Sequence, residues 1–417
     1  MSQSAAECNG KGIKLIFDLF CSLAQTPRPN GMPAESVILA EFFEQITLAD
    51  QLGFDTVWVA ETHYSSEAQQ RHANPVLRSW RGEIGVNNDI CQLAPRIFER
   101  TATLSVGSAI MNVVCNGGPL AAAERVATAV ALHGLDPMER RKINIGFAGG
   151  RFDFVNATSG IRPRAEWERR AWPQIKKAIF WEAAETFVRL LSGEGLASSD
   201  VASLSLGAGD FSDPAAWREI AGLAGARGDE VVVPRRWEYE YTKIVPSDYR
   251  RELLTLTAGT HDPELQKHLN TFAPVRAFNL SITQSAVIEA THDRMRQCFH
   301  PAGGPWCRDY MPRTVFVFVN GNPRLTEQSQ RDAATLRARE ALSAYWTAME
   351  NTVDAARLAK SESNALVGNP DDVASQISDR YHPDDRLMLW FDFFANDNAA
   401  VLQAMEDFWT YVVPRLK

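Results

Sequence analysis

The stretch GFDTVWVAETHYSS, residues 53–66, joins a turn, a buried strand and a polar ending. Gly53 ends a helical pattern, and the β-branched, apolar run 56–60 that follows is typical of a strand covered on both faces. The run then gives way to a polar segment that contains Glu61 and His63. Residues two apart share one face of a strand, so a carboxylate can orient the imidazole at this end. The pattern indicates a functional site, with a hydrogen-bonded structural histidine as the alternative.

Short β-like runs alternate with longer helical patterns along the rest of the chain. The expected strands are residues 13–20, 56–60, 103–111, 142–150, 252–260, 274–281, 313–319 and 386–394, with an extra strand at 238–245 beside them. Eight strands with intervening helices predict an α/β protein with a parallel sheet. The count of eight favours a closed (β/α)8 TIM barrel over an open doubly wound sheet.

The domain organisation follows from where this alternation is interrupted. Helices are expected at 34–51, 119–133, 164–191 and 399–412. A segment rich in Gly, Ser and Ala begins at Ser192, and the β/α alternation resumes after it. We therefore expect a flexible tail at 1–12 and one barrel domain at 13–417 with an insertion at about 192–237. The insertion and the segment 343–367 are candidate lids.

Composition excludes several classes of function. Hydrophobic residues make up 45% and charged residues 23% of 417 residues, which is ordinary for a soluble globular protein. The net charge of −8 argues against non-specific nucleic-acid binding, and no apolar run is long enough for a membrane span. Six cysteines without a CxxC motif suggest a reduced, cytoplasmic setting. The cysteines and histidines between 292 and 307 match no usual zinc spacing, so no metal site is expected.

In a (β/α)8 barrel the functional groups lie at the carboxyl ends of the strands. The fourth expected strand ends in Ala-Gly-Gly before Arg151, which leaves room for something large and flat. The fifth ends in TAGTHDPEL, where Thr260 and His261 precede a helix start at Asp262–Pro263. Backbone N–H groups at such a start bind phosphate, and Arg151 would add a charged contact. A planar cofactor with a phosphate fits both ends; alternatively, the glycines only ease a turn and Thr260 only caps a helix.

Several motifs together resemble the bacterial luciferase-like flavin-dependent monooxygenase family. GFDTVWVAETHY resembles the second-strand motif of that family. LSVGSAIMN and the following segment to GFAGG resemble its third strand, helix and fourth strand. VPSDYRRELLTLTAGTHDPEL resembles its fifth strand and phosphate loop, and ALVGNPDDVASQISDRY with DRLMLWFDFF and FWTYVVPRL resembles its last strand and final helix. The order and spacing of these segments carry the resemblance, which leaves out about 192–237 and the loop 71–95.

The resemblance implies a barrel that binds reduced FMN, or F420 in a sister branch. The flavin would lie across the barrel mouth against a bulge in the third strand, where the family often has a non-proline cis peptide, here at Ala109–Ile110. The implied cofactor-binding residues are Ala109, Ile110, Gly149, Arg151, Gly259, Thr260 and His261. The implied catalytic residues are His63, which would donate or accept a proton, and Glu61, which would orient it.

The implied reaction is that of a two-component monooxygenase. A flavin reductase would supply reduced FMN, because the chain has no GxGxxG motif for a nicotinamide nucleotide. Oxygen would add at C4a, and the resulting C4a-peroxyflavin would oxidise a small organic substrate. Thr62 stands where the family keeps the first histidine of its second-strand motif, which argues against a bioluminescent reaction. We also expect a homodimer; the alternatives are an F420-dependent hydride-transfer oxidoreductase and a non-catalytic flavin-binding subunit.

Overall fold

The computed structural model describes residues 15–73, 75–348, 363–395 and 397–416. The expected tail at 1–12 and the middle of the candidate lid at 343–367 lie outside these ranges. Within them, no helix combines the length and the apolarity needed to cross a membrane.

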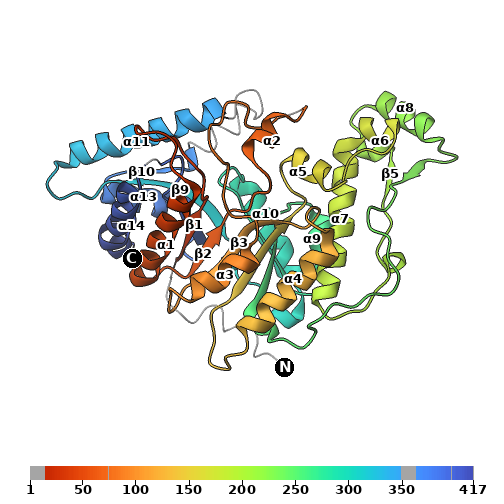
Figure 1. Ribbon diagram of the computed structural model, residues 1–417, viewed down its shortest axis with the longest axis horizontal. Helices are drawn as coiled ribbons and strands as arrows, with labels where there is room; N and C mark the ends of the chain where they lie inside the picture. Colours follow the sequence, from red (N-terminus) through yellow and green to blue (C-terminus); the bar gives the residue numbers. More distant parts are fainter. Residues whose placement is uncertain (1–14, 74, 349–362, 396, 417) are drawn as a thin grey trace.

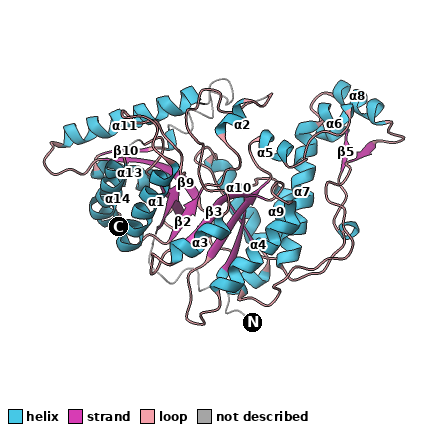
Figure 2. Cartoon of the chain, viewed as in Figure 1, coloured by secondary structure: helices cyan, strands magenta, loops and turns pink. Residues whose placement is uncertain are grey.

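A curled parallel sheet forms the centre of the described structure (Figure 2). Its order is β10-β9-β11-β1-β2-β3-β4-β7-β8. The strands are β1 Ile16–Cys21, β2 Thr56–Val59, β3 Ser105–Asn112, β4 Ile143–Ala148, β7 Leu254–Ala258, β8 Val275–Ala277, β9 Arg313–Val319, β10 Leu366–Gly368 and β11 Arg386–Trp390. All eight expected barrel strands are present, and among the described strands of this sheet only the three-residue β10 was not anticipated, because so short a run has no recognisable period.

Contacts between the ends of the sheet show how far it curls. A parallel bridge joins Asn279, just after β8, to Arg313 in β9, and the Asn279 N–H donates to Pro312 O at 2.9 Å. Trp58 of β2 meets Phe278 across the interior with ring centroids 5.6 Å apart, although three strands separate β2 from β8 in the sheet. The predicted TIM-barrel class is confirmed.

Helices surround the sheet (Figure 1). They are α1 Glu35–Leu52, α2 Ser66–Gln70, α3 Ile90–Phe98, α4 Gly118–His133, α5 Asp153–Thr158, α6 Glu166–Arg170, α7 Trp172–Leu191, α8 Pro214–Ala224, α9 Pro263–Leu269, α10 Ser285–Cys298, α11 Glu327–Ala348, α13 Pro370–Arg380 and α14 Asn398–Asp407. The single helix expected at 164–191 is two helices, because Pro173 lacks an N–H and fits only the first turn of a new helix after Ala171. The closing helix ends in a π-helical turn, Phe408–Val412.

The extra strand expected at 238–245 is wrong. Only Thr242 forms a β-bridge, with Leu196 of the preceding segment, and Tyr241 and Val245 are exposed. Ile244 and Tyr239 pack against the core, so the apolar positions of this pattern reflect burial of side chains and not a strand in the sheet. A small antiparallel pair, β5 Ser205–Gly207 and β6 Glu230–Val232, forms instead. With α8 it projects at one end of the molecule, beside α6 and away from the sheet (Figure 1).

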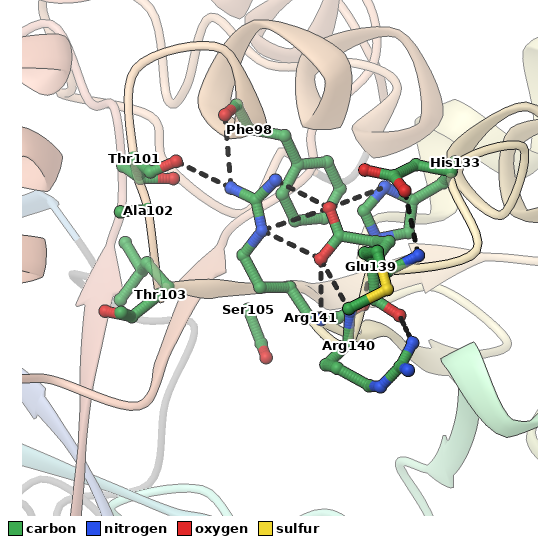
Figure 3. Close-up of polar contacts among 12 residues, drawn as sticks. Phe98, Thr101, Ala102, Thr103, Ser105, His133, Glu139, Arg140 and Arg141 are labelled. Atoms are coloured by element: carbon green, nitrogen blue, oxygen red, sulfur yellow. Dashed lines mark hydrogen bonds and ion pairs between the residues drawn. The ribbon is translucent and has the colours of Figure 1, made fainter.

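A polar network ties α3, α4 and the start of β4 together at the amino end of the strands (Figure 3). The Arg141 guanidinium donates to Thr101 O at 2.6 Å and to Phe98 O at 3.1 Å, and pairs with Glu139 Oε2 at 2.6 Å. His133 stacks on the Phe98 ring with centroids 3.9 Å apart. Because these groups lie at the strand starts, they stabilise the face opposite the one where a barrel carries its site.

Candidate active site

The predicted site residues follow or end four strands that are neighbours in the sheet. Glu61 and His63 come after β2, Ala109 and Ile110 lie in β3, Gly149 and Arg151 follow β4, and Gly259, Thr260 and His261 follow β7. The order β2-β3-β4-β7 is continuous and parallel, so these groups lie along one edge of the barrel wall. All are half-buried except Arg151, which is exposed.

Glu61 and His63 form the pair that the sequence predicted. His63 Nε2 lies 3.3 Å from Glu61 Oε1, and the Glu61 side chain is only 2% exposed. The backbone between them is held by Asn87, which accepts from Thr62 N and donates from Nδ2 to Ala60 O, each at 2.9 Å. The pair is therefore built on a rigid segment that continues β2.

Burial and neighbouring groups raise the pKa of both members of this pair, by different causes. Burial raises the pKa of the Glu61 carboxyl, and the hydrogen bond from His63 offsets only part of the rise. Burial would lower the pKa of His63, but contacts with the Cys115 thiol and the Glu61 carboxylate raise it to about 10. At neutral pH the imidazole therefore carries a proton. Glu61 Oε2 is buried without a hydrogen-bond partner among the described residues, so it can accept from a bound molecule.

Strand β3 has the expected irregularity. Its pairing with β4 shifts register between Ser108 and Met111, and the Ala109–Ile110 peptide is cis. The residues of this bulge pack on the apolar interior formed by Trp58 and Phe278 together with Phe20 and Met388. The bulge therefore borders an aromatic surface at the centre of the barrel.

The glycines at the strand ends make room for neighbouring side chains. A Cβ on Gly259 would lie 2.8 Å from Ile110 Cδ1, and one on Gly149 would lie 3.0 Å from Phe180 Cβ. Gly150 has φ of 79°, and a Cβ there would lie 2.2 Å from Asn112 Nδ2. The space that the sequence suggested for a flat ligand is therefore used in part by the protein itself, with Ile110 seated against Gly259.

The turn after β7 differs in detail from the expectation. Helix α9 begins at Pro263, and its cap is Asp262, whose Oδ1 accepts from Glu264 N at 3.0 Å and Leu265 N at 3.2 Å. Thr260 Oγ1 accepts from Asp262 N at 3.1 Å, so its hydroxyl belongs to the turn. The first-turn N–H groups of α9 already have an acceptor. Within the described ranges, the N–H groups of Thr260 and His261 make no hydrogen bond to the protein and remain for an anion.

His261 and Arg151 lie near this turn and differ in charge and exposure. Burial lowers the pKa of His261, so its imidazole is neutral, and its buried Nδ1 has no hydrogen-bond partner among the described residues. Arg151 lies with its guanidinium carbon 5.8 Å from the Phe152 ring centroid. A neutral ring donor or acceptor and a solvent-facing cation suit the polar end of a phosphate-bearing ligand.

The structure adds residues to the site that sequence reasoning did not select. Asn112 Nδ2 donates to Asn156 Oδ1 at 2.8 Å, and Asn156 Nδ2 donates to Gly149 O at 2.9 Å. This chain of amides joins the loops after β3 and β4. No spacing in the sequence signals the bond between Asn112 and Asn156, because the two residues lie in different β/α units.

The described structure also has a cavity of about 560 Å³ that none of the predicted site residues lines. It lies between α11 and the segments that follow β1 and β11. Its lining includes Trp80, Phe318, Arg337, Phe393 and Phe394. We assign the candidate active site to the strand ends and not to this cavity. The reason is that the Glu61–His63 pair and the β3 bulge both lie at the strand ends.

Comparison with known proteins bears on the first part of the chain most directly. The sequence model described as luciferase-like monooxygenase matches residues 17–134, which run from β1 to the end of α4. No curated protein matches the chain.

Solved structures share the fold along nearly the whole chain. A monooxygenase from Streptomyces bottropensis has a TM-score of 0.62 at 16% identity, covering 97% of this chain and 100% of that one. The oxygenating constituent of 3,6-diketocamphane monooxygenase from Pseudomonas putida, in complex with FMN, has a TM-score of 0.57 at 12% identity over 97% and 99%. An F420-dependent secondary alcohol dehydrogenase in complex with an F420-acetone adduct has a TM-score of 0.53 at 12% identity over 97% and 99%.

The fold is that of a TIM barrel. The resemblance drawn from the motifs is supported over residues 17–134, where the model described as luciferase-like monooxygenase matches. The matching family and the similar structures are monooxygenases or other oxidoreductases, and they include both an FMN complex and an F420 complex.

Proposed function

We propose that this chain is an FMN-dependent, two-component monooxygenase that uses reduced FMN and O2 to oxidise a small organic substrate. The observation that carries the proposal is the barrel mouth, where the Glu61–His63 pair stands beside the Ala109–Ile110 bulge. Reduced FMN, when bound, supplies the two electrons that activate O2, so that one oxygen atom enters the substrate and the other leaves as water. A separate flavin reductase provides the reduced flavin.

The residues of the mouth have distinct roles in this proposal. Ala109 and Ile110 form the wall for the flavin ring, and Gly259 lets Ile110 take its place. The N–H groups of Thr260 and His261, with Arg151 at the rim, hold the phosphate. Gly149, at the end of β4, takes part by leaving room for Phe180 beside the cofactor site.

The protonated His63 supplies a proton from the imidazole, the neutral ring can then take one back, and Glu61 fixes the orientation of the ring. The aromatic side chains of Phe20, Trp58 and Phe278 line the interior below the bulge. A water-poor surface of this kind limits the loss of a reactive oxygen species to solvent. The protein therefore contributes orientation, proton control and exclusion of water.

The test is an anaerobic titration of the pure chain with reduced FMN, followed by oxygen uptake with a flavin reductase and a panel of small organic compounds. We expect saturable FMN binding and substrate-dependent oxygen uptake, with a product one oxygen atom heavier by mass. Absence of saturable FMN binding would refute the proposal. Binding without turnover across the panel would favour a non-catalytic flavin-binding subunit.

A second candidate is an F420-dependent hydride-transfer oxidoreductase on the same barrel. It is favoured by the similarity to the F420-dependent secondary alcohol dehydrogenase over the whole length of both chains. Anaerobic reduction of F420 by secondary alcohols, without oxygen uptake, would identify this function. We also propose a single barrel domain with the insertion at about 192–237, and a homodimer, which light scattering on the purified chain would test.

A further inference from the structure

The cavity of about 560 Å³ lies between α11 and the segments that follow β1 and β11. Helix α11 is packed beside β9 and β10 (Figure 1). The lining comes from chain that follows β1, β2 and β11 and from Phe318 near the end of β9, and the carboxyl ends of parallel strands meet at one end of a barrel. Small-molecule sites have volumes of about 300–1,000 Å³. The cavity therefore has the size of such a site and lies at the same end of the barrel as the Glu61–His63 pair.

One wall of the cavity is aromatic. Phe318, Phe393 and Phe394 line it together with Trp80. The Phe394 ring lies 4.9 Å from that of Phe393 and 4.8 Å from that of Trp80, between centroids. The backbone of Phe394 has φ of 49°, a left-handed conformation that is rare for a bulky residue and that concentrates at ligand sites. The wall therefore offers ring faces and edges to a flat apolar molecule.

A second wall is one face of α11. Arg337, Ala341, Ala344 and Ala348 line the cavity at spacings of four, three and four residues, which places them on one face of the helix. The alanine side chains fill little space, and Arg337 stands at one end of their row. The helix therefore combines room for an apolar body with a cation.

Arg337 has its charge available to a ligand. Within the described residues its guanidinium forms neither an ion pair nor a hydrogen bond. Asp397 and Asp407 act on this charge from a distance, but Asp397 caps α14 and Asp407 accepts from a backbone N–H of the β9–α11 turn. The other charged residues of the lining, Arg81 and Glu340, are both exposed and opposite in sign. A cation that borders an apolar cavity without a carboxylate partner suits an anionic group on the ligand.

Aromatic rings connect the cavity to the wall proposed for the flavin. The Trp390 ring lies 4.8 Å from that of Phe393 and 4.4 Å from that of Phe20, between centroids. Phe20 and Trp390 belong to the apolar cluster that also contains Ala109 and Ile110. A molecule that begins in the cavity can therefore continue along this layer toward the β3 bulge.

We propose that the cavity binds the substrate by an acid group, and that the substrate class is an aromatic carboxylic acid. Its ring packs on Phe318, Phe393 and Phe394, its carboxylate pairs with Arg337, and the part to be oxidised extends past Trp390 toward the bulge. The role as a substrate site rests on the proposed monooxygenase function, whereas the binding of an aromatic acid does not.

The test is a calorimetric titration of the flavin-free protein with 2-naphthoate and with its uncharged amide, 2-naphthamide. The acid should bind saturably and the amide at least about tenfold more weakly, because only the acid forms an ion pair. Arg337→Met keeps the apolar stem and removes the charge, so it should weaken binding of the acid by at least about tenfold and of the amide by less than about threefold. Arg337→Lys, which keeps a cation, should bind the acid with an affinity between those of the wild type and Arg337→Met.

Two further variants control for the place of binding. Arg339→Met is the matched control, because Arg339 is exposed on α11 and does not line the cavity, so both affinities should stay unchanged. Ala344→Leu fills the cavity and should abolish binding of both compounds. Thermal unfolding checks that each variant is folded, and Arg337→Gln replaces Arg337→Met if the latter is not.

Any of four results would overturn the proposal: no saturable binding of 2-naphthoate, equal affinities for acid and amide, an equal loss of acid affinity in Arg337→Met and Arg339→Met, or unchanged binding in Ala344→Leu. Should the monooxygenase function hold, 2-naphthoate should compete with the substrate, and Arg337→Met should raise KM at least about tenfold with kcat within about threefold. Non-competitive inhibition would show that the cavity is not the substrate site. If oxygen uptake is never observed, the titrations still decide whether the cavity takes an aromatic acid, so the two proposals fail separately.

Discussion

Ile110 fills the space in front of Gly259, so that a Cβ at residue 259 would lie only 2.8 Å from Ile110 Cδ1. This contact joins the β3 bulge to the end of β7 and sets the position of the wall proposed for the flavin. A single methyl group at 259 must therefore displace Ile110 or the strand end.

Gly259→Ala tests this contact. Overpacking of this kind costs about 1–3 kcal/mol of stability, and we expect FMN affinity to fall by at least about tenfold because the wall moves. Thermal unfolding and flavin titration measure the two effects. Gly222→Ala adds the same methyl group in α8, where nothing lies within 4 Å, and should be neutral or slightly stabilising. Equal FMN affinity in Gly259→Ala and the wild type would show that Ile110 does not shape the flavin site.

The pKa of His63 predicts a pH-dependent contribution to stability. Its value is about 10 in the folded chain against an ordinary value of 6.5, so the folded state binds the proton more tightly. The stabilisation is complete below about pH 6.5 and disappears as the pH rises through about 10. His63→Gln should therefore lose about 3 kcal/mol at pH 6 and much less at pH 10. Thermal unfolding at both pH values, with the exposed His382→Gln as a control, gives the comparison; a pH-independent loss would contradict it.

His63→Ala separates binding from turnover. Removal of the imidazole should lower oxygen uptake by about 100-fold or more, as for loss of a general acid or base, and leave flavin affinity within about threefold. A large loss of flavin affinity would instead assign His63 to the cofactor site. Thr62→His, at the position where luciferase-like proteins keep a histidine, provides a second variant in which flavin binding should persist.

The phosphate proposal predicts a difference between FMN and riboflavin. Arg151→Ala should weaken FMN by about tenfold and riboflavin hardly at all, because riboflavin lacks the phosphate. The effect should shrink at high salt, since Arg151 is exposed. Arg140→Ala, at the opposite end of the barrel (Figure 3), is the control. An equal loss of affinity for both flavins would show that Arg151 does not bind the phosphate.

The network at the amino end of the strands predicts an effect on stability alone. Arg141→Met removes the donors to Phe98 O and Thr101 O and the ion pair with Glu139, which should cost about 2 kcal/mol. The hydrogen bond from Arg141 lowers the pKa of Glu139 to about 2, so this contribution is present above about pH 4.5 and is lost as the pH falls toward 2. Unfolding measurements across this range should show it, while FMN affinity stays unchanged. A change in flavin affinity would contradict the purely structural role.

The sequence predicted the barrel and the strand ends because both depend on local patterns. Apolar runs located every barrel strand, and parallel topology brings their carboxyl ends to one edge. The pair Glu61 and His63 was found in the same way, since residues two apart on a strand share a face. The extra strand at 238–245 failed because an alternating pattern does not reveal which partner, if any, a segment pairs with.

By itself, the sequence determined the order of elements, the Glu61–His63 pair and the resemblance that pointed to Ala109–Ile110. Only the tertiary structure decided which groups meet at the barrel mouth: Ile110 packs against Gly259, and Asn112 donates to Asn156. The structure also shows that Asp262 caps α9. Its carboxylate accepts from the first-turn N–H groups that the sequence analysis had assigned to a phosphate. The contacts at the barrel mouth join different β/α units, and their geometry depends on the curl of the whole sheet and not on spacing along the chain.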